Sequence, residues 1–147
     1  MKKRISPPKR RRTRQRMAIL EELCSTTLHP NVAELYGPLK SRLPSISMST
    51  LYRNLDALRQ AGDILELQIP GHNKRYDGRT TLHYHVICER CGAVRDVPED
   101  YVSLRPGLRG EIDGFELTGF RLDFIGICPS CRNGGSDARA RSHVLEN

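Results

Sequence analysis

The chain has 147 residues, five cysteines and a net charge of +7 at neutral pH. It contains no apolar run of roughly 18 residues and no signal-peptide pattern, so the sequence predicts neither a membrane protein nor a secreted one. We therefore expect a cytoplasmic location, where cysteines favour metal binding over disulfides.

The positive charge is concentrated at the N-terminus. Residues 1–16 contain nine Lys or Arg and no acid, so the rest of the +7 chain carries a net charge of −2. A like-charged block that includes Pro7 and Pro8 buries little apolar surface, and we expect residues 1–12 to be a disordered basic arm. Such an arm is either a solubilising tail or a contact for nucleic-acid phosphates.

The first predicted helix runs from Thr13, a candidate N-cap, to Cys24. Met17, Leu20 and Cys24 recur at helical spacing, which predicts that they share one face, with Ile19 and Leu23 beside it. Free cysteine behaves as a small hydrophobe, so we expect Cys24 to be buried. The helical pattern then breaks at His29–Pro30.

The second predicted helix begins after Asn31, which with Glu34 approaches the capping-box pattern. Its apolar residues follow helical spacing: Val32, Leu35, Leu39 and Leu43. Gly37–Pro38 predicts a kink or a split, because proline removes a backbone hydrogen bond. Pro44 is expected to end the helix.

The third predicted helix spans Ser49 to Ala61, with Leu51, Leu55 and Leu58 on one face and Gly62 as its stop signal. Residues 65–69 and 74–76 then predict two short strands joined by a turn. Helices followed by a two-stranded wing are typical of a winged helix-turn-helix, whose later helix enters the DNA major groove.

The third helix also supplies most of the candidate DNA contacts. Arg53 could read a guanine edge or bind a phosphate, and Tyr52 could contact a thymine methyl group or a phosphate. The full candidate set is Arg14, Ser49, Thr50, Tyr52, Arg53 and Asn54.

The remaining sequence predicts a second, smaller domain. After a hinge at residues 77–81 come strands at 83–87, 93–97 and 115–127, and a weak helix at 101–113. A polar tail occupies residues 133–147. The fold class is therefore α+β: a winged-helix domain over residues 13–76 and a small α/β domain over residues 82–132.

Two C-x-x-C pairs predict a zinc site in this second domain. Cys88, Cys91, Cys128 and Cys131 supply four thiolates, which bind Zn²⁺ in a closed, structural tetrahedron. Two separate redox-active pairs are the less favoured interpretation. On a strand His83 and His85 point to one face and Cys88 to the other, so the histidines belong to a different site.

A winged helix followed by H-x-H-x-x-C-x-x-C and a closing C-x-x-C resembles the ferric uptake regulator family from about Thr13 to Cys131. Thr13–Arg16, His29–Pro30 and Ser49–Asn54 also match its motifs. The resemblance implies a homodimeric, metal-dependent transcription regulator, usually a repressor, whose C-terminal domain mediates dimerisation. The implied partner is double-stranded operator DNA, palindromic and rich in A/T.

The resemblance also implies a regulatory site that binds Fe²⁺ or Mn²⁺ beside one structural zinc per subunit. In the peroxide-sensing branch its ligands are three histidines and two aspartates, which fall here on His29, Asp77, His83, His85 and Asp96. Iron-sensing relatives commonly use glutamates, and many have a further site for which Leu82, Tyr84 and Phe120 supply no ligand. These differences favour a repressor that senses peroxide through iron.

Three alternatives compete with this interpretation. An iron-, zinc- or manganese-responsive regulator of the same family is the nearest one. A zinc hydrolase or deaminase is disfavoured, because a deaminase needs H-x-E and Ile87 follows His85 at that spacing, so we expect no enzyme. A zinc-ribbon adaptor without DNA contacts would leave the predicted wing and Arg53 without a role.

Overall fold

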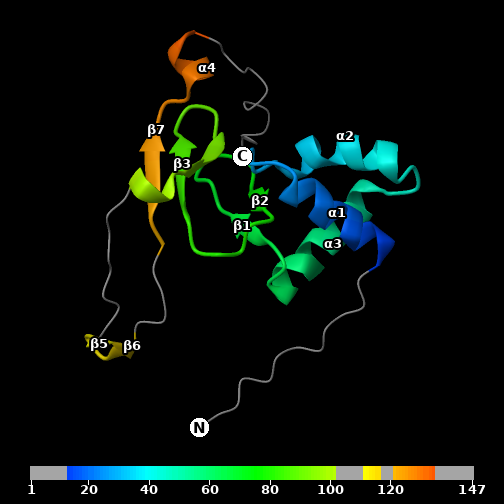
Figure 1. Cartoon of the computed structure of the whole chain (residues 1–147), viewed down its shortest axis with the longest axis horizontal. Coiled ribbons are helices and arrows are strands. Elements are labelled where there is room, and N and C mark those ends of the chain that lie inside the picture. The colour runs from blue at the N-terminus through cyan, green and yellow to red at the C-terminus, as the bar shows by residue number, and fades with distance from the viewer. Residues whose placement is uncertain (1–12, 102–110, 117–120, 135–147) are drawn as a thin grey trace, which may run out of the picture. The chain divides into compact units, whose positions relative to one another are not determined.

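The computed structural model describes residues 13–101, 111–116 and 121–134. The chain divides into two compact units, Met1–Thr81 and Leu82–Asn147 (Figure 1). The predicted basic arm at 1–12 and nearly all of the predicted tail lie outside the described residues. No helix in the described ranges is long and apolar enough to cross a membrane.

The first unit contains the three predicted helices: α1 (Arg14–Cys24), α2 (Val32–Arg42) and α3 (Met48–Ala61). Each begins at a polar N-cap, because the Thr13, Asn31 and Ser47 side chains accept hydrogen bonds from amides of the first turn. Asn31 and Glu34 complete a capping box. Gly62 ends α3 in the left-handed conformation at φ 75°.

Helix α2 is not split at Gly37–Pro38, contrary to one predicted outcome. It continues through Pro38 to Arg42 and ends before Pro44. Leu35 and Leu39, on either side of Pro38, are both buried in the core. Their packing stabilises the turn in which proline removes one backbone hydrogen bond.

The buried face of α1 is centred on the two residues predicted to lie beside it, not on Met17 and Cys24. Ile19 and Leu23 are 0% and 2% exposed, whereas Met17 is 36% exposed and Cys24 is exposed. The prediction that Cys24 is buried was therefore wrong. The core of this unit takes the larger branched side chains at i and i+4 and leaves the thiol near the unit's surface, where Cys24 Sγ lies 3.8 Å from the Gly78 carbonyl oxygen.

The wing consists of β1 (Leu65–Leu67) and β2 (Arg75–Asp77), paired antiparallel. Tyr76 in β2 packs into the helical core, and burial raises the pKa of its hydroxyl to about 12. The predicted strand pair is confirmed, although β1 is shorter than predicted. Three helices and a two-stranded wing together define a winged-helix unit.

The second unit contains a three-stranded sheet formed by β3 (Tyr84–Cys88), β4 (Val94–Val97) and β7 (Asp123–Gly126), in the order β4-β3-β7. Strand β3 is antiparallel to β4 and parallel to β7. As a result His85 is paired with Asp96 on one side and with Asp123 on the other. The central strand thus presents His85 between two carboxylates.

Two predictions for this unit were partly wrong. The single strand predicted at 115–127 is replaced by β6 (Phe115–Glu116) and β7, and β6 pairs with β5 (Glu111–Ile112). The helix predicted at 101–113 ends as strand and turn, and its middle lies outside the described residues. A short 3-10 helix, η1 (Glu99–Tyr101), and α4 (Pro129–Arg132) complete the unit.

Candidate metal centres and nucleic-acid interface

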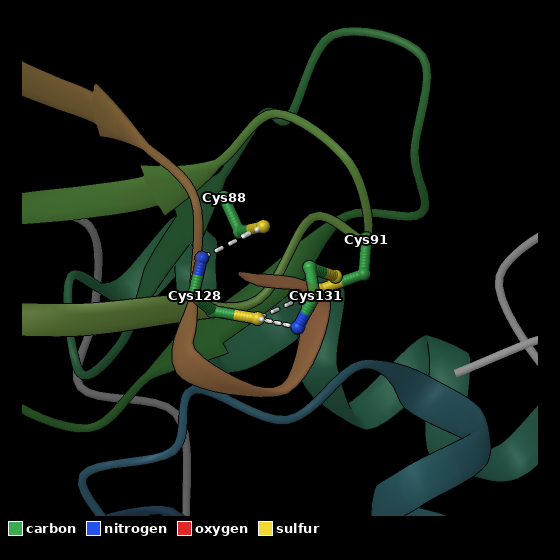
Figure 2. Close-up of side chains that lie close together, drawn as sticks. All are labelled: Cys88, Cys91, Cys128 and Cys131. Carbon is green, nitrogen blue, oxygen red and sulfur yellow. Dashed lines mark hydrogen bonds between the residues drawn. The ribbon is translucent and has the colours of Figure 1, made fainter. Parts of the chain in front are cut away.

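The four cysteines converge at one end of the three-stranded sheet (Figure 2). Cys88 ends β3, Cys91 lies in the following turn, and Cys128 and Cys131 come from the start of α4. Their sulfur atoms all lie within 4.8 Å of one another, and Cys91 Sγ is 3.7 Å from Cys128 Sγ. A tetrahedral ZnS₄ centre with Zn–S bonds of about 2.3 Å has S–S edges of about 3.8 Å. The cluster therefore fits Zn²⁺ with small adjustments.

Backbone amides also stabilise the thiolate form of a cysteine in this cluster. Burial by itself would raise the pKa of the Cys88 thiol, but amide donors from Cys128, Cys91 and Arg90 outweigh burial and lower that pKa to about 6. The neighbouring thiol of Cys128, together with burial, raises the pKa of Cys131 to about 12. Four sulfurs at these distances cannot all be thiolates without a cation between them. The donor set thus calls for a soft divalent ion.

The first unit carries a buried imidazole–carboxylate pair. His29 Nε2 lies 3.4 Å from Asp77 Oδ2, and the two side chains are 2% and 7% exposed. The ring is fixed from its other edge: Nδ1 lies 2.8 Å from the Thr27 carbonyl oxygen, so Nδ1 carries the proton and donates it. This tautomer leaves the Nε2 lone pair on the side of Asp77, as a metal ligand requires.

The backbone around His29 is also held in place. His29 has φ 50°, a conformation that few non-glycine residues adopt. Arg75 Nη1 in β2 donates to the His29 carbonyl oxygen at 3.0 Å and to Glu34 at 2.9 Å. The amide of Tyr76 donates to the Pro30 carbonyl oxygen at 3.0 Å. The wing strand thereby fixes the loop that carries His29.

The second unit carries the other three predicted regulatory ligands. His83 Nε2 and His85 Nε2 lie 3.4 Å and 3.7 Å from the same oxygen, Asp96 Oδ1. The two imidazole rings meet edge to face with centroids 4.5 Å apart, and their side chains are 1% and 6% exposed. Two ring nitrogens and one carboxylate oxygen thus converge on one point, an arrangement that suits Fe²⁺, Mn²⁺ or Zn²⁺.

The candidate DNA contacts lie on α1 and α3 of the first unit. Arg14, Ser49, Tyr52 and Arg53 are exposed, and Thr50 is half-buried. Asn54, in contrast, is 8% exposed. Its side chain bonds to Gln15 at 3.2 Å and accepts from Arg16 Nε at 3.3 Å, which ties α1 to α3 beside a hollow of about 390 Å³. The motif marked Asn54 as functional but did not indicate that it would be buried.

Sequence reasoning did not single out Asp123. It lies next to His85 across the parallel pair of β3 and β7, with Asp123 Oδ1 3.8 Å from His85 Nδ1. No sequence pattern states which strands pair, so no signal in the chain alone placed Asp123 beside His85. The residue could be found only from the register of the sheet.

A winged-helix unit and a second unit with a four-thiolate cluster and a convergent His/Asp set define a metal-dependent transcription factor. Comparison with known proteins identifies which kind. The sequence model of the ferric uptake regulator family matches residues 9–125, and this chain belongs to that family.

Several relatives are similar over most of their length. A protein of Staphylococcus epidermidis described as peroxide-responsive repressor PerR is 34% identical over 84% of this chain and 83% of its own. The peroxide operon regulator of Bacillus subtilis is 36% identical over 81% and 82% of the two chains. These relatives are transcription regulators.

Solved structures show the same fold. The Campylobacter jejuni peroxide stress regulator is 27% identical, with a TM-score of 0.62, over 80% of this chain and 88% of its own. A zinc-bound manganese uptake regulator is 30% identical, with a TM-score of 0.60, over 80% and 90%. The expected α+β fold of this family is thereby confirmed.

Proposed function

We propose that this protein is a metal-dependent, DNA-binding transcriptional repressor that senses peroxide through iron held by His29, Asp77, His83, His85 and Asp96. The observation that carries the proposal is the pair of His/Asp groups, one in each unit, which we call the two halves of the metal site. Each unit has a buried imidazole with one nitrogen directed at an aspartate: His29 at Asp77 in the first unit, and His83 at Asp96 in the second. One relative described as a peroxide-responsive repressor and another described as a peroxide operon regulator support the same function.

The two halves of the metal site are joined by a short segment of chain. Asp77 and His83 are six residues apart, which limits their separation to about 20 Å even in a fully extended segment. One ion bound by both halves favours a single arrangement of the two units. The arrangement that binds DNA and the one that does not then differ in metal affinity. Metal binding can raise DNA affinity at most by the ratio of these two metal affinities.

The proposal assigns a role to each segment of the chain. Residues 13–76 bind DNA, residues 77–81 act as the hinge, and residues 82–132 hold metal and dimerise. The basic arm at 1–12 contacts phosphates, and residues 133–147 are a tail. One zinc per subunit occupies the cysteine cluster. The protein acts in the cytoplasm and is not an enzyme.

Dimerisation is supported by an exposed apolar side chain at a sheet edge. Strand β7 is the last strand in the order β4-β3-β7, and Ile125 within it is 74% exposed. An exposed strand edge with an apolar side chain is a surface that a second copy can cover. A twofold dimer requires two half-sites in the operator, so the operator is palindromic, and the arm suits A/T-rich minor grooves.

Helix α3 is the reading helix in this proposal. Tyr52 and Arg53 project from the face opposite Leu51, Leu55 and Leu58, which are buried. Arg53 Nη2 lies 3.4 Å from Thr50 Oγ1, which orients the guanidinium along the first turns of the helix. Asn54 is buried beneath this surface, where it accepts a hydrogen bond from Arg16 and contacts no base.

The decisive test is DNA binding by protein loaded anaerobically with one metal at a time. We expect the Mn²⁺ and Fe²⁺ forms to bind promoter DNA, and protein with zinc only in the cysteine cluster to bind it far more weakly. His85→Ala should abolish the metal response and leave the zinc content unchanged. Equal DNA affinity with and without regulatory metal, measured by fluorescence anisotropy, would refute metal-dependent repression.

Arg53→Ala is expected to weaken specific DNA binding by about 1–3 kcal/mol, because a base-reading guanidinium is lost. Affinity for random DNA should fall much less. Arg59→Ala on the same helix is the matched control, since Arg59 bonds Asp56 at 2.7 Å and takes no part in the proposed contact. An equal loss on specific and random DNA would assign Arg53 to a phosphate instead.

A second candidate function is a metal sensor without peroxide chemistry. The His/Asp donors also fit Mn²⁺ and Zn²⁺. The similarity to a zinc-bound manganese uptake regulator supports this alternative. Release of DNA by peroxide from the iron form separates the two functions.

A further inference from the structure

We propose that Asp123 is a positioning residue for the regulatory metal: its carboxylate holds the His85 imidazole in the tautomer and orientation that bind the ion. The inference rests on the proposed function, since it concerns a ligand of that site. It starts from a row of three side chains across the sheet. Asp96 on β4, His85 on β3 and Asp123 on β7 occupy paired positions, so they share one face.

The two carboxylates approach opposite edges of the ring. His85 Nε2 lies 3.7 Å from Asp96 Oδ1, and His85 Nδ1 lies 3.8 Å from Asp123 Oδ1. Nε2 also faces the point on which His83 converges, so Nε2 is the metal-binding nitrogen. The proton of a neutral imidazole that ligates through Nε2 must be on Nδ1, where Asp123 can accept it.

Asp123 is held ready for this bond. Its Oδ2 accepts from Arg121 Nε at 2.6 Å, which fixes one side of the carboxylate. Its Oδ1 is buried and has no hydrogen-bond partner within the part of the chain that the structure describes. A buried carboxylate oxygen without a partner is costly, and the Nδ1–H of His85 lies within an ångström of hydrogen-bond distance. Ring adjustment on metal binding closes that gap.

The first unit also holds a predicted ligand histidine through its Nδ1, with a backbone carbonyl as the acceptor in place of a carboxylate. His29 Nδ1 donates to the Thr27 carbonyl oxygen at 2.8 Å, while Nε2 faces Asp77. A carboxylate makes a stronger acceptor than a carbonyl and increases the basicity of the imidazole it holds. His85 is therefore the more strongly supported of these two ligands. Asp123 is not itself a ligand of the same ion, because a metal on Nε2 lies on the far side of the ring.

The test compares Asp123→Ala and Asp123→Asn with Asp100→Asn in the full-length protein with its cysteine zinc. Asp100 is an exposed carboxylate of the same unit and controls for the loss of one charge. Asp123→Ala should lower Mn²⁺ affinity about 10–100-fold, the usual effect of removing an outer-shell partner. Asp123→Asn should lose less, because an amide oxygen can still accept, and Asp100→Asn should match the wild type.

A second readout reports the tautomer directly. With Zn²⁺ in both sites, long-range ¹H–¹⁵N spectra should show the His85 proton on Nδ1, assigned by its absence in His85→Gln. Mn²⁺ affinity of Asp123→Ala within twofold of wild type, or a His85 proton on Nε2, would overturn the inference. If Asp123→Ala loses zinc or fold, the comparison of Asp123→Asn with Asp100→Asn decides the question. If Asp123→Ala binds Mn²⁺ like the wild type while His85→Ala binds none, this inference is refuted but the proposed function stands.

Discussion

Cys88→Ser or Cys128→Ser is expected to remove one zinc ion per subunit and to abolish the dimer. Serine cannot supply the thiolate that closes the tetrahedron, and an all-thiolate site has no other position from which solvent can replace it. The cluster joins the end of β3 to the start of α4, where Cys128 N donates to Cys88 Sγ at 3.3 Å. Loss of zinc therefore separates the two ends of the second unit.

The expected effect is large because the described part of this unit has little apolar core of its own. Its buried hydrophobic residues among those described are Ile87, Cys88, Val94, Val97 and Cys131, and two of these five belong to the cysteine cluster. Structural zinc contributes roughly 10–16 kcal/mol of apparent binding free energy, most of which is folding free energy in a small unit. Among the described residues, the three other buried apolar side chains of this unit offer little to offset its removal.

Zinc content by elemental analysis and mass by sedimentation equilibrium measure the two consequences. Cys24→Ser is the matched control, since Cys24 is an exposed thiol in the first unit, outside the cluster. It should keep both zinc and dimer. A zinc-free Cys128→Ser protein that remained a dimer of wild-type thermal stability would show that the cluster has no structural role.

The cysteine cluster illustrates what could be predicted from the sequence. Two C-x-x-C pairs restrict the ligand chemistry by residue type and spacing alone, before any strand is placed. The helices were equally accessible, because caps such as Thr13, Asn31 and Gly62 act within one turn of the chain. Local chemistry of this kind does not depend on the tertiary fold.

The errors arose where tertiary packing decides. Met17 and Cys24 fit a helical stripe as well as Ile19 and Leu23 do, and only the packing against α2 and α3 selects the second pair. A split of α2 at Pro38 was one of the two expected outcomes, but burial of the flanking leucines keeps the helix continuous. Asp123 was missed because the parallel pairing of β7 with β3 is a non-local contact.

Peroxide is expected to release DNA from the iron form and to add one oxygen atom to His29 or His83, while the manganese form stays bound and unmodified. Fe²⁺ held by His29, Asp77, His83, His85 and Asp96 would supply one electron to cleave the peroxide O–O bond and would regain one electron from the ring, chemistry that Mn²⁺ does not readily perform. In the net reaction an imidazole C–H and H₂O₂ give an oxidised ring and water, so the ring loses two electrons and peroxide gains them. A ligand altered in this way binds metal less well, and the arrangement that binds DNA is no longer favoured.

Burial makes this oxidation diagnostic. His29 is 2% exposed, whereas Met17 is 36% exposed and Cys24 is exposed. An oxidant arriving from bulk solvent would reach Met17 and Cys24 first. Oxygen on His29 with Met17 intact therefore indicates an oxidant generated at the site. Tryptic peptides 17–40 and 80–90 contain the two target histidines, and fragment ions must separate His29 from Met17 and His83 from His85.

Asp96→Glu sharpens the test. Asp96 Oδ1 lies within 3.7 Å of both His83 Nε2 and His85 Nε2, so one added methylene shifts the carboxylate without removing its charge. The variant should keep metal-dependent DNA binding and show much less histidine oxidation at equal peroxide. Release of DNA without oxygen on any histidine peptide would move the sensing chemistry to the cysteines. No release at all, with Fe²⁺ still bound, would make the protein a plain metal sensor, because the same ligands would then respond to metal occupancy alone.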